Sequence, residues 1–142
     1  MDIDPGCNPD IVGSITDIGD IGEFDVVYSC HCLEHVHGHE VARVLAEFHR
    51  VLRPGGAVLI FVPDLENVHP TDEVLFNAPV GPITGMDLFY GKQDMIERMP
   101  YMAHKTGFTA NSLKASMDAA GFMPVAVKRL HCFNLFGAGR KL

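Results

Sequence analysis

Hydrophobic residues recur every three or four positions over residues 39–53, a spacing that predicts an amphipathic helix. Basic residues crowd its last turn, where they interact favourably with the helix dipole, and Pro54-Gly55-Gly56 predicts its end. The apolar positions are Val41, Val44, Leu45, Phe48, Val51 and Leu52. The polar positions on the other face are Glu40, Arg43, Glu47 and Arg50.

Four further segments of the first half are expected to be strands or strand ends. Residues 24–29 (FDVVYS) are rich in aromatic and β-branched residues and predict a strand. The uninterrupted apolar run 57–62 (AVLIFV) is too short for a typical helix, so we expect a strand buried on both faces. Residues 1–5 resemble the tail of a strand, and residues 11–15 a short strand.

The second half begins with a long stretch, residues 64–108, in which we expect irregular structure. A stretch of this length inside a compact domain is usually a lid or a binding loop. Thr109 is a plausible N-cap for a helix over 110–120. Residues 123–130 and 131–136 are candidate strands of a terminal hairpin.

This order of strands and helices predicts an α/β fold. Strand–helix–strand alternation implies a mostly parallel sheet with right-handed crossovers, here followed by a C-terminal antiparallel hairpin. Ligands of such sheets bind outside the carboxyl ends of the strands.

The composition of the chain indicates what kind of molecule it binds and in which compartment it is found. The chain has 142 residues, which suits one domain, and its net charge of -7 argues against broad nucleic-acid binding and leaves a small molecule as the expected partner. The longest apolar runs are far short of the ~20 residues that span a bilayer. The four cysteines form no disulfide or zinc pattern, so we expect a reducing, cytoplasmic location.

Residues 24–62 carry a resemblance to a known family. The strand and loop FDVVYSCHCLEHV, a helix ending EFHRVLRPGG and the apolar strand closed by Val62-Pro63-Asp64 occur in the order found in class I S-adenosylmethionine-dependent methyltransferases. Residues 104–109 and 120–122 resemble later parts of the small-molecule members. The resemblance implies a Rossmann-like sheet, S-adenosylmethionine as cofactor and methyl transfer to a small-molecule acceptor.

One departure from the family stands out. Its first strand and following glycine-rich turn, which let the backbone approach the cofactor, have no counterpart in the sequence. We therefore expect an N-terminally truncated sheet that lacks the first strand and helix. The alternative is an inactive remnant or interaction module, possibly an intertwined homodimer in which another chain fills the gap.

The resemblance implies positions for a cofactor site. Asp2, with Asp4 as the near alternative, matches the acidic residue that binds the ribose hydroxyls. An aspartate before a proline, the position that Asp4 holds, is also a frequent turn former. Three residues match the segment that holds adenine, although the family more often has Asp where the serine stands: Ser14, Ile15 and Asp17. Three come at the end of the family's fourth strand, here residues 24–29, and would lie beside the methionine and sulfonium: Ser29, Cys30 and His31.

Histidines supply the remaining candidates. His31, Glu34 and His35 follow an i, i+3, i+4 pattern that could face one metal ion, with His104 or His131 as a distant ligand. Some metal-dependent RNA and quinone-precursor methyltransferases look similar here, but they carry Glu where His31 stands. The sequence Leu-Glu-His is common in the family without metal, so we expect no metal. His104 and Tyr90 are candidates for substrate contact or proton removal.

Overall fold

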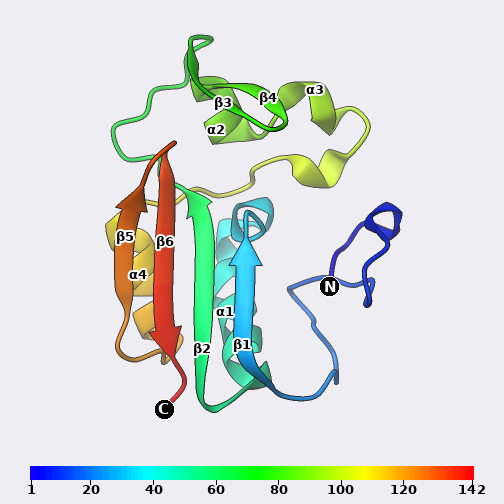
Figure 1. The fold of residues 1–142 in the computed structure, drawn as a ribbon, viewed down its shortest axis with the longest axis vertical. Coiled ribbons are helices and arrows are strands. Elements are labelled where there is room, and N and C mark those ends of the chain that lie inside the picture. Colours follow the sequence, from blue (N-terminus) through cyan, green and yellow to red (C-terminus); the bar gives the residue numbers. More distant parts are fainter.

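The computed structural model describes all residues, 1–142, and has one main sheet with a smaller unit above it (Figure 1). Helices α1 and α4 lie against the same face of the sheet, and the unit formed by residues 64–108 lies over the carboxyl ends of β1 and β2. The main sheet and its helices are β1 (Phe24–Cys30), α1 (Val41–Val51), β2 (Leu52–Pro63), α4 (Ala110–Ala119), β5 (Ala126–Leu130) and β6 (Asn134–Arg140).

The four strands of the main sheet lie in the order β1-β2-β6-β5. Strands β1 and β2 pair in parallel, while β2 with β6 and β6 with β5 pair antiparallel. The α/β class and the antiparallel C-terminal hairpin are therefore confirmed. Parallel pairing is confined to one pair, where we expected a mostly parallel sheet, because β6 pairs directly with β2 and residues 1–15 add no strand to β1.

Helix α1 fills the core as its sequence pattern predicts. Its apolar face is buried against the sheet, and Leu52 begins β2 with no loop between helix and strand. Helix α4 starts at the predicted cap, where the Thr109 side chain accepts a hydrogen bond from the backbone N–H of Ser112. Its apolar residues Leu113 and Met117 are fully buried. The two helices thus cover one face of the sheet. The apolar run 57–62 is in a strand as expected, the inner strand β2, but its side chains alternate between buried and half-buried, so the expected burial on both faces was wrong.

The N-terminal segment differs from the expectation. Residues 1–5 and 11–15 are not strands; they meet only in an isolated parallel bridge between Asp2 and Val12. A short 3-10 helix, Pro5–Cys7, turns the chain back directly after Asp4. The bend comes too early for a ladder to extend, and β1 therefore pairs with β2 alone.

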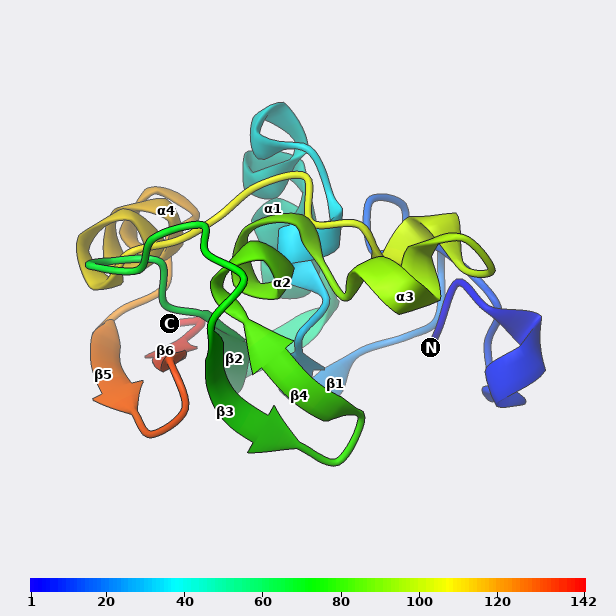
Figure 2. The ribbon, with the colours of Figure 1, turned by 90° about the horizontal axis from the view of Figure 1, so that it is seen from above.

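Residues 64–108 are more regular than expected. They contain a hairpin and two short helices around a small apolar core of Val68, Ile83 and Leu88 (Figure 2). The prediction of an irregular stretch was wrong in this respect, because elements of four to six residues leave little periodicity in the sequence. The elements are β3 (Val74–Ala78), β4 (Gly81–Thr84), α2 (Gly85–Tyr90), α3 (Gln93–Ile96) and the 3-10 helix η4 (Pro100–Met102).

The last hairpin lies slightly later in the chain than predicted. Residues 131–133 form its turn, and β6 runs on to Arg140 through two glycines. A Cβ atom at Gly139 would lie 2.8 Å from Cβ of Phe122, so close packing explains why glycine stands inside this strand. No helix in the structure combines the length and the apolar character needed to cross a membrane.

Candidate functional site

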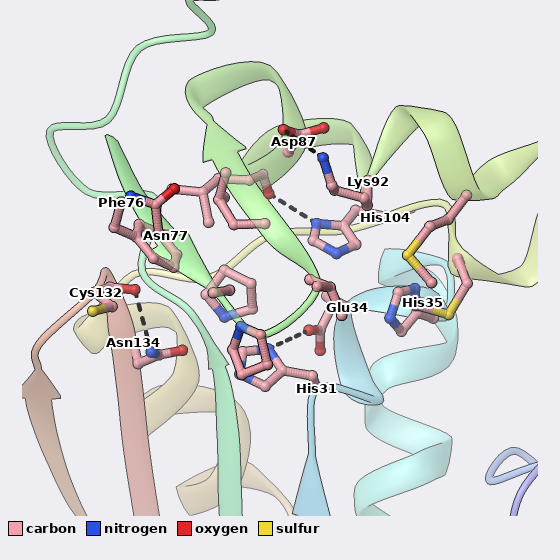
Figure 3. A pocket seen from close by; sticks show the side chains of 18 residues that line it. His31, Glu34, His35, Phe76, Asn77, Asp87, Lys92, His104, Cys132 and Asn134 are labelled. Atoms are coloured by element: carbon pink, nitrogen blue, oxygen red, sulfur yellow. Dashed lines mark hydrogen bonds and ion pairs between the residues drawn. The ribbon is translucent and has the colours of Figure 1, made fainter. Parts of the chain in front are cut away.

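A cavity of about 510 Å³ lies between the carboxyl ends of the sheet strands and the unit above them (Figure 3). Such a volume is within the range of about 300–1,000 Å³ that small-molecule sites occupy. Its floor comes from the segment after β1 and from the end of β2, and its roof from β3, β4 and α2. The polar or ionisable groups that line it are His31, Glu34, His35, Asn77, Asp87, Lys92, His104, Cys132 and Asn134.

His31 and Glu34 form a pair on the floor of this cavity. His31 adopts a left-handed backbone conformation, φ 51°, directly after β1, and its Nδ1 lies 3.0 Å from Oε1 of Glu34. The Glu34 side chain is only 1% exposed, and its second oxygen, Oε2, has no hydrogen-bond partner. The hydrogen bond to Glu34 raises the pKa of His31 above its ordinary value. A buried carboxylate with a free oxygen therefore faces the cavity.

The backbone of Glu34 joins the two parts of the molecule. Its carbonyl oxygen accepts hydrogen bonds from the backbone N–H groups of Lys105, at 2.8 Å, and Thr106, at 3.2 Å. These contacts bring the end of the 64–108 unit back to the sheet, and His104 with it. The carboxylate and His104 consequently meet although 70 positions separate them in the sequence.

Two more histidines flank the carboxylate. His35 Nδ1 lies 3.2 Å from the carbonyl oxygen of Ala103, and His104 Nδ1 lies 2.8 Å from that of Leu88. The two rings meet edge to face, with centroids 5.0 Å apart. Burial lowers the pKa of His104, which favours its neutral form.

A second, smaller cavity of about 180 Å³ runs along β1 beside the N-terminal segment. It is mostly apolar, and its lining includes Met1 and Ile15 of the N-terminal segment together with Ser29 and Cys32. The Ser29 hydroxyl is buried and has no hydrogen-bond partner. A lone buried hydroxyl in an apolar cavity is a position where a ligand group can supply the missing hydrogen bond.

Some of the residues predicted for a cofactor site come together. Ile15 and Ser29 line the smaller cavity, and His31 lines the larger one two residues further on. Residues 29–34 thus contribute to both cavities. Cys30 is exposed and lines neither cavity, because alternation along β1 turns its side chain away from buried Ser29.

The other predicted cofactor residues lie in the N-terminal segment and line neither cavity. The Asp2 carboxylate accepts a hydrogen bond of 2.9 Å from the backbone N–H of Asp4. Asp4 accepts from the N–H of Gly6 and so forms the turn expected of an aspartate before a proline. Ser14 and Asp17 pair with each other in an isolated bridge. Asp2 nevertheless adjoins Met1, which does line the smaller cavity.

The two catalytic candidates have different places. His104 lines the larger cavity, and the Tyr90 side chain is 51% exposed and does not. Tyr90 contributes only its carbonyl oxygen, which accepts a hydrogen bond from the N–H of His104. Asn77, Lys92 and Asn134 also line the larger cavity, but nothing in their local sequence distinguishes them before the fold brings them together.

The sequence and the fold have known relatives. Residues 7–60 match the family described as Methyltransferase domain. A putative O-methyltransferase from Nostoc punctiforme superposes with a TM-score of 0.60 at 18% identity, over 92% of this chain and 35% of that one. The 1,6-didemethyltoxoflavin-N1-methyltransferase of Burkholderia thailandensis, with bound S-adenosylhomocysteine, superposes at 0.59, with 21% identity over 92% and 49%. The chain has the methyltransferase fold.

A third solved structure adds a partner protein to the comparison. The methyltransferase in the complex of the Haloferax volcanii Trm112 activator with a putative methyltransferase superposes at 0.61, with 17% identity over 92% of this chain and 60% of that one. The chain thus spans about a third to three fifths of the length of these three structures. The resemblance to class I S-adenosylmethionine-dependent methyltransferases inferred from residues 24–62 is confirmed at the level of the fold and of the matched segment.

Proposed function

We propose that the chain contributes to methyl transfer from S-adenosylmethionine to a small-molecule acceptor. The observation that carries this proposal is the segment 29–34, which borders a small cavity on one side and a larger one on the other. A donor in the first and an acceptor in the second would meet at the carboxyl end of β1, where ligands of α/β sheets bind. S-adenosylmethionine supplies a methyl group already activated on a sulfonium, so the protein mainly aligns donor and acceptor.

The residues of the smaller cavity fit part of a nucleoside-type donor. The buried Ser29 hydroxyl offers a hydrogen bond, and Ile15 offers an apolar surface. At about 180 Å³ the cavity accommodates only a portion of such a molecule, so we expect the N-terminal segment, which carries Asp2 and Asp17, to adjust around the remainder.

The larger cavity suits an acceptor of apolar character with a few polar groups. Phe76, Ile83 and Leu88 line it, and Asn77 and Asn134 offer amide groups for orientation. His104 is the candidate for contact with the acceptor or removal of its proton, because Nδ1 is held by Leu88 and Nε2 remains available. A cytoplasmic location remains part of this proposal.

Donor binding tests the proposal by calorimetry with the purified chain. We expect S-adenosylmethionine and S-adenosylhomocysteine each to bind at one site, and Ser29→Ala to weaken both. Cys30→Ala is the matched control, since Cys30 is the adjacent residue but exposed outside both cavities. No detectable heat with either compound would contradict the proposal.

A second candidate function is an interaction module that forms a homodimer. The observation in its favour is the outer edge of β1, which has no paired neighbour and exposes Val26 by 51% and Tyr28 by 62%. Unpaired strand edges invite pairing with another chain. Light scattering distinguishes the two: a monomer that binds S-adenosylhomocysteine argues against the module, and a dimer that binds neither donor compound argues for it.

A further inference from the structure

The floor of the larger cavity brings together three hydrogen-bond acceptors. One carboxylate oxygen of Glu34 and one ring nitrogen each of His35 and His104 all lie within 4.8 Å of one another. Figure 3 shows the three side chains converging from two parts of the fold, the segment after β1 and the end of the 64–108 unit.

The hydrogen bonds of the two histidines determine which ring nitrogen of each has a lone pair available. A carbonyl oxygen can only accept, so Nδ1 of His35 donates to Ala103 and Nδ1 of His104 donates to Leu88. In a neutral ring whose Nδ1 carries the hydrogen, Nε2 has a free lone pair. The same arrangement, with one ring nitrogen donating to a backbone carbonyl, orients nearly all metal-binding histidines in proteins.

The Glu34 carboxylate completes the set, and one of its two oxygens lacks a partner. Glu34 is 1% exposed, His31 occupies its Oε1, and Oε2 is buried without any hydrogen-bond donor. A buried carboxylate oxygen left without a donor is costly, and two neighbouring lone pairs add to the need for a positive charge. The one lysine among the lining residues, Lys92, has its amine engaged by the Pro82 carbonyl oxygen and by Asp87.

We propose that Glu34, His35 and His104 bind a divalent transition-series cation. Two imidazole nitrogens and one carboxylate oxygen suit Zn²⁺ or Co²⁺ better than Mg²⁺ or Ca²⁺, which prefer oxygen ligands. Two ligand atoms that bind one ion tetrahedrally at about 2.0–2.2 Å lie roughly 3.4 Å apart. The three atoms lie within 4.8 Å of one another, so small side-chain movements bring them onto an ion. All three side chains line the cavity, so the ion keeps a position open to a molecule bound there.

A metal ion at this site goes beyond the proposed methyl transfer and changes one part of it. A cation on Nε2 of His104 occupies the atom that would otherwise take the proton of the acceptor. His31 then acts as a positioning residue, because its hydrogen bond holds Oε1 and leaves Oε2 for the ion. The prediction from sequence that no metal binds is replaced by this proposal.

Titration calorimetry with Zn²⁺ alone tests the site, using the untagged, metal-free chain without any methyl donor. We expect one ion per chain, weaker binding of Mg²⁺, and a loss of Zn²⁺ affinity of roughly tenfold or more in Glu34→Gln and in His104→Ala. The control is His37→Ala with His39→Ala, since these histidines are exposed and lie next to the site in sequence. Because no donor is present, the result is independent of the methyltransferase proposal.

A second readout uses the wild-type chain and so does not depend on the folding of any variant. Nitrogen-detected NMR of the imidazoles should show Nδ1–H tautomers for His35 and His104 and a shift of both Nε2 resonances when Zn²⁺ is added. The proposal is overturned if wild type binds no Zn²⁺, if Glu34→Gln and His104→Ala bind as wild type does, or if only His37 and His39 respond in the spectrum.

Discussion

Thr84 and Asp87 cap helix α2 reciprocally. The Thr84 Oγ1 accepts a hydrogen bond of 3.1 Å from the backbone N–H of Asp87, and the Asp87 Oδ2 accepts one of 2.9 Å from the N–H of Thr84. The other oxygen of Asp87 accepts from the N–H of Gln93 at the start of α3. One carboxylate thus ties β4, α2 and α3 into the roof of the larger cavity, which it also lines.

Asp87→Ala should therefore loosen this roof. We expect a loss of about 1–2 kcal/mol in the free energy of unfolding, because a capping box is lost. Relative to wild type, amide exchange should become faster in residues 84–93 and stay unchanged in the main sheet. Hydrogen-exchange mass spectrometry checks the second point. Asp94→Ala serves as control, since the Asp94 side chain is 70% exposed and should change neither quantity. An increase in exchange spread evenly over the whole chain would contradict the prediction.

Glu47 links helix α1 to the N-terminal segment and should make stability depend on acid pH. Its carboxylate accepts hydrogen bonds from Arg50 and from the backbone N–H of Ile18, at 3.0 Å. The hydrogen bond from Arg50 is the main cause of a pKa of about 2, below the ordinary 4.5. A lowered pKa means that this stabilisation is complete above about pH 4.5 and disappears as the pH falls toward 2.

Glu47→Gln should accordingly lower the free energy of unfolding at pH 7 by about 1 kcal/mol. The difference from wild type should shrink between pH 4.5 and 2, measured by urea denaturation at several pH values. Glu23→Gln, an exposed carboxylate of the same segment, should match wild type throughout. A constant difference across the acid range would show that the Glu47 charge is not the cause.

Gly139 allows β6 to pack closely on the chain after α4. A Cβ atom there would lie 2.8 Å from Cβ of Phe122, which is fully buried. We expect Gly139→Ala to lower the free energy of unfolding by about 1–3 kcal/mol through overpacking. Ala138→Ser, on the adjacent and half-buried position, should change it by no more than about 0.5 kcal/mol. A thermal midpoint equal to that of wild type in Gly139→Ala would contradict the packing explanation.

Regular periodicity made the main sheet and its helices predictable. Helix α1 was expected over 39–53 and observed at Val41–Val51, and the Thr109 cap of α4 was found where predicted. Each of these elements buries a complete apolar face, which leaves a repeating pattern. The hairpin and short helices of 64–108 leave no such pattern, because capping and turn contacts such as that of Asp87 hold them together.

The candidate site was predictable only in part for a similar reason. Ser29 lies near the end of a recognisable strand and His31 directly follows it, so their place at its carboxyl end could be inferred. The meeting of Glu34 with His104 depends on hydrogen bonds from Lys105 and Thr106 to a backbone carbonyl, and no local pattern announces these. The N-terminal segment was misjudged because its strand-like residues find no ladder to join.

The central claim is that residues 29–34 separate a donor site from an acceptor site, and NMR of the ¹⁵N-labelled chain tests it most directly. Titration with S-adenosylhomocysteine should shift the backbone amides of Ile15, Ser29 and Cys32, which line the smaller cavity, and leave Asn77 and Ile83 on the far side of the larger cavity unchanged. No shift at saturating concentration, or shifts confined to residues 64–108, would contradict the account.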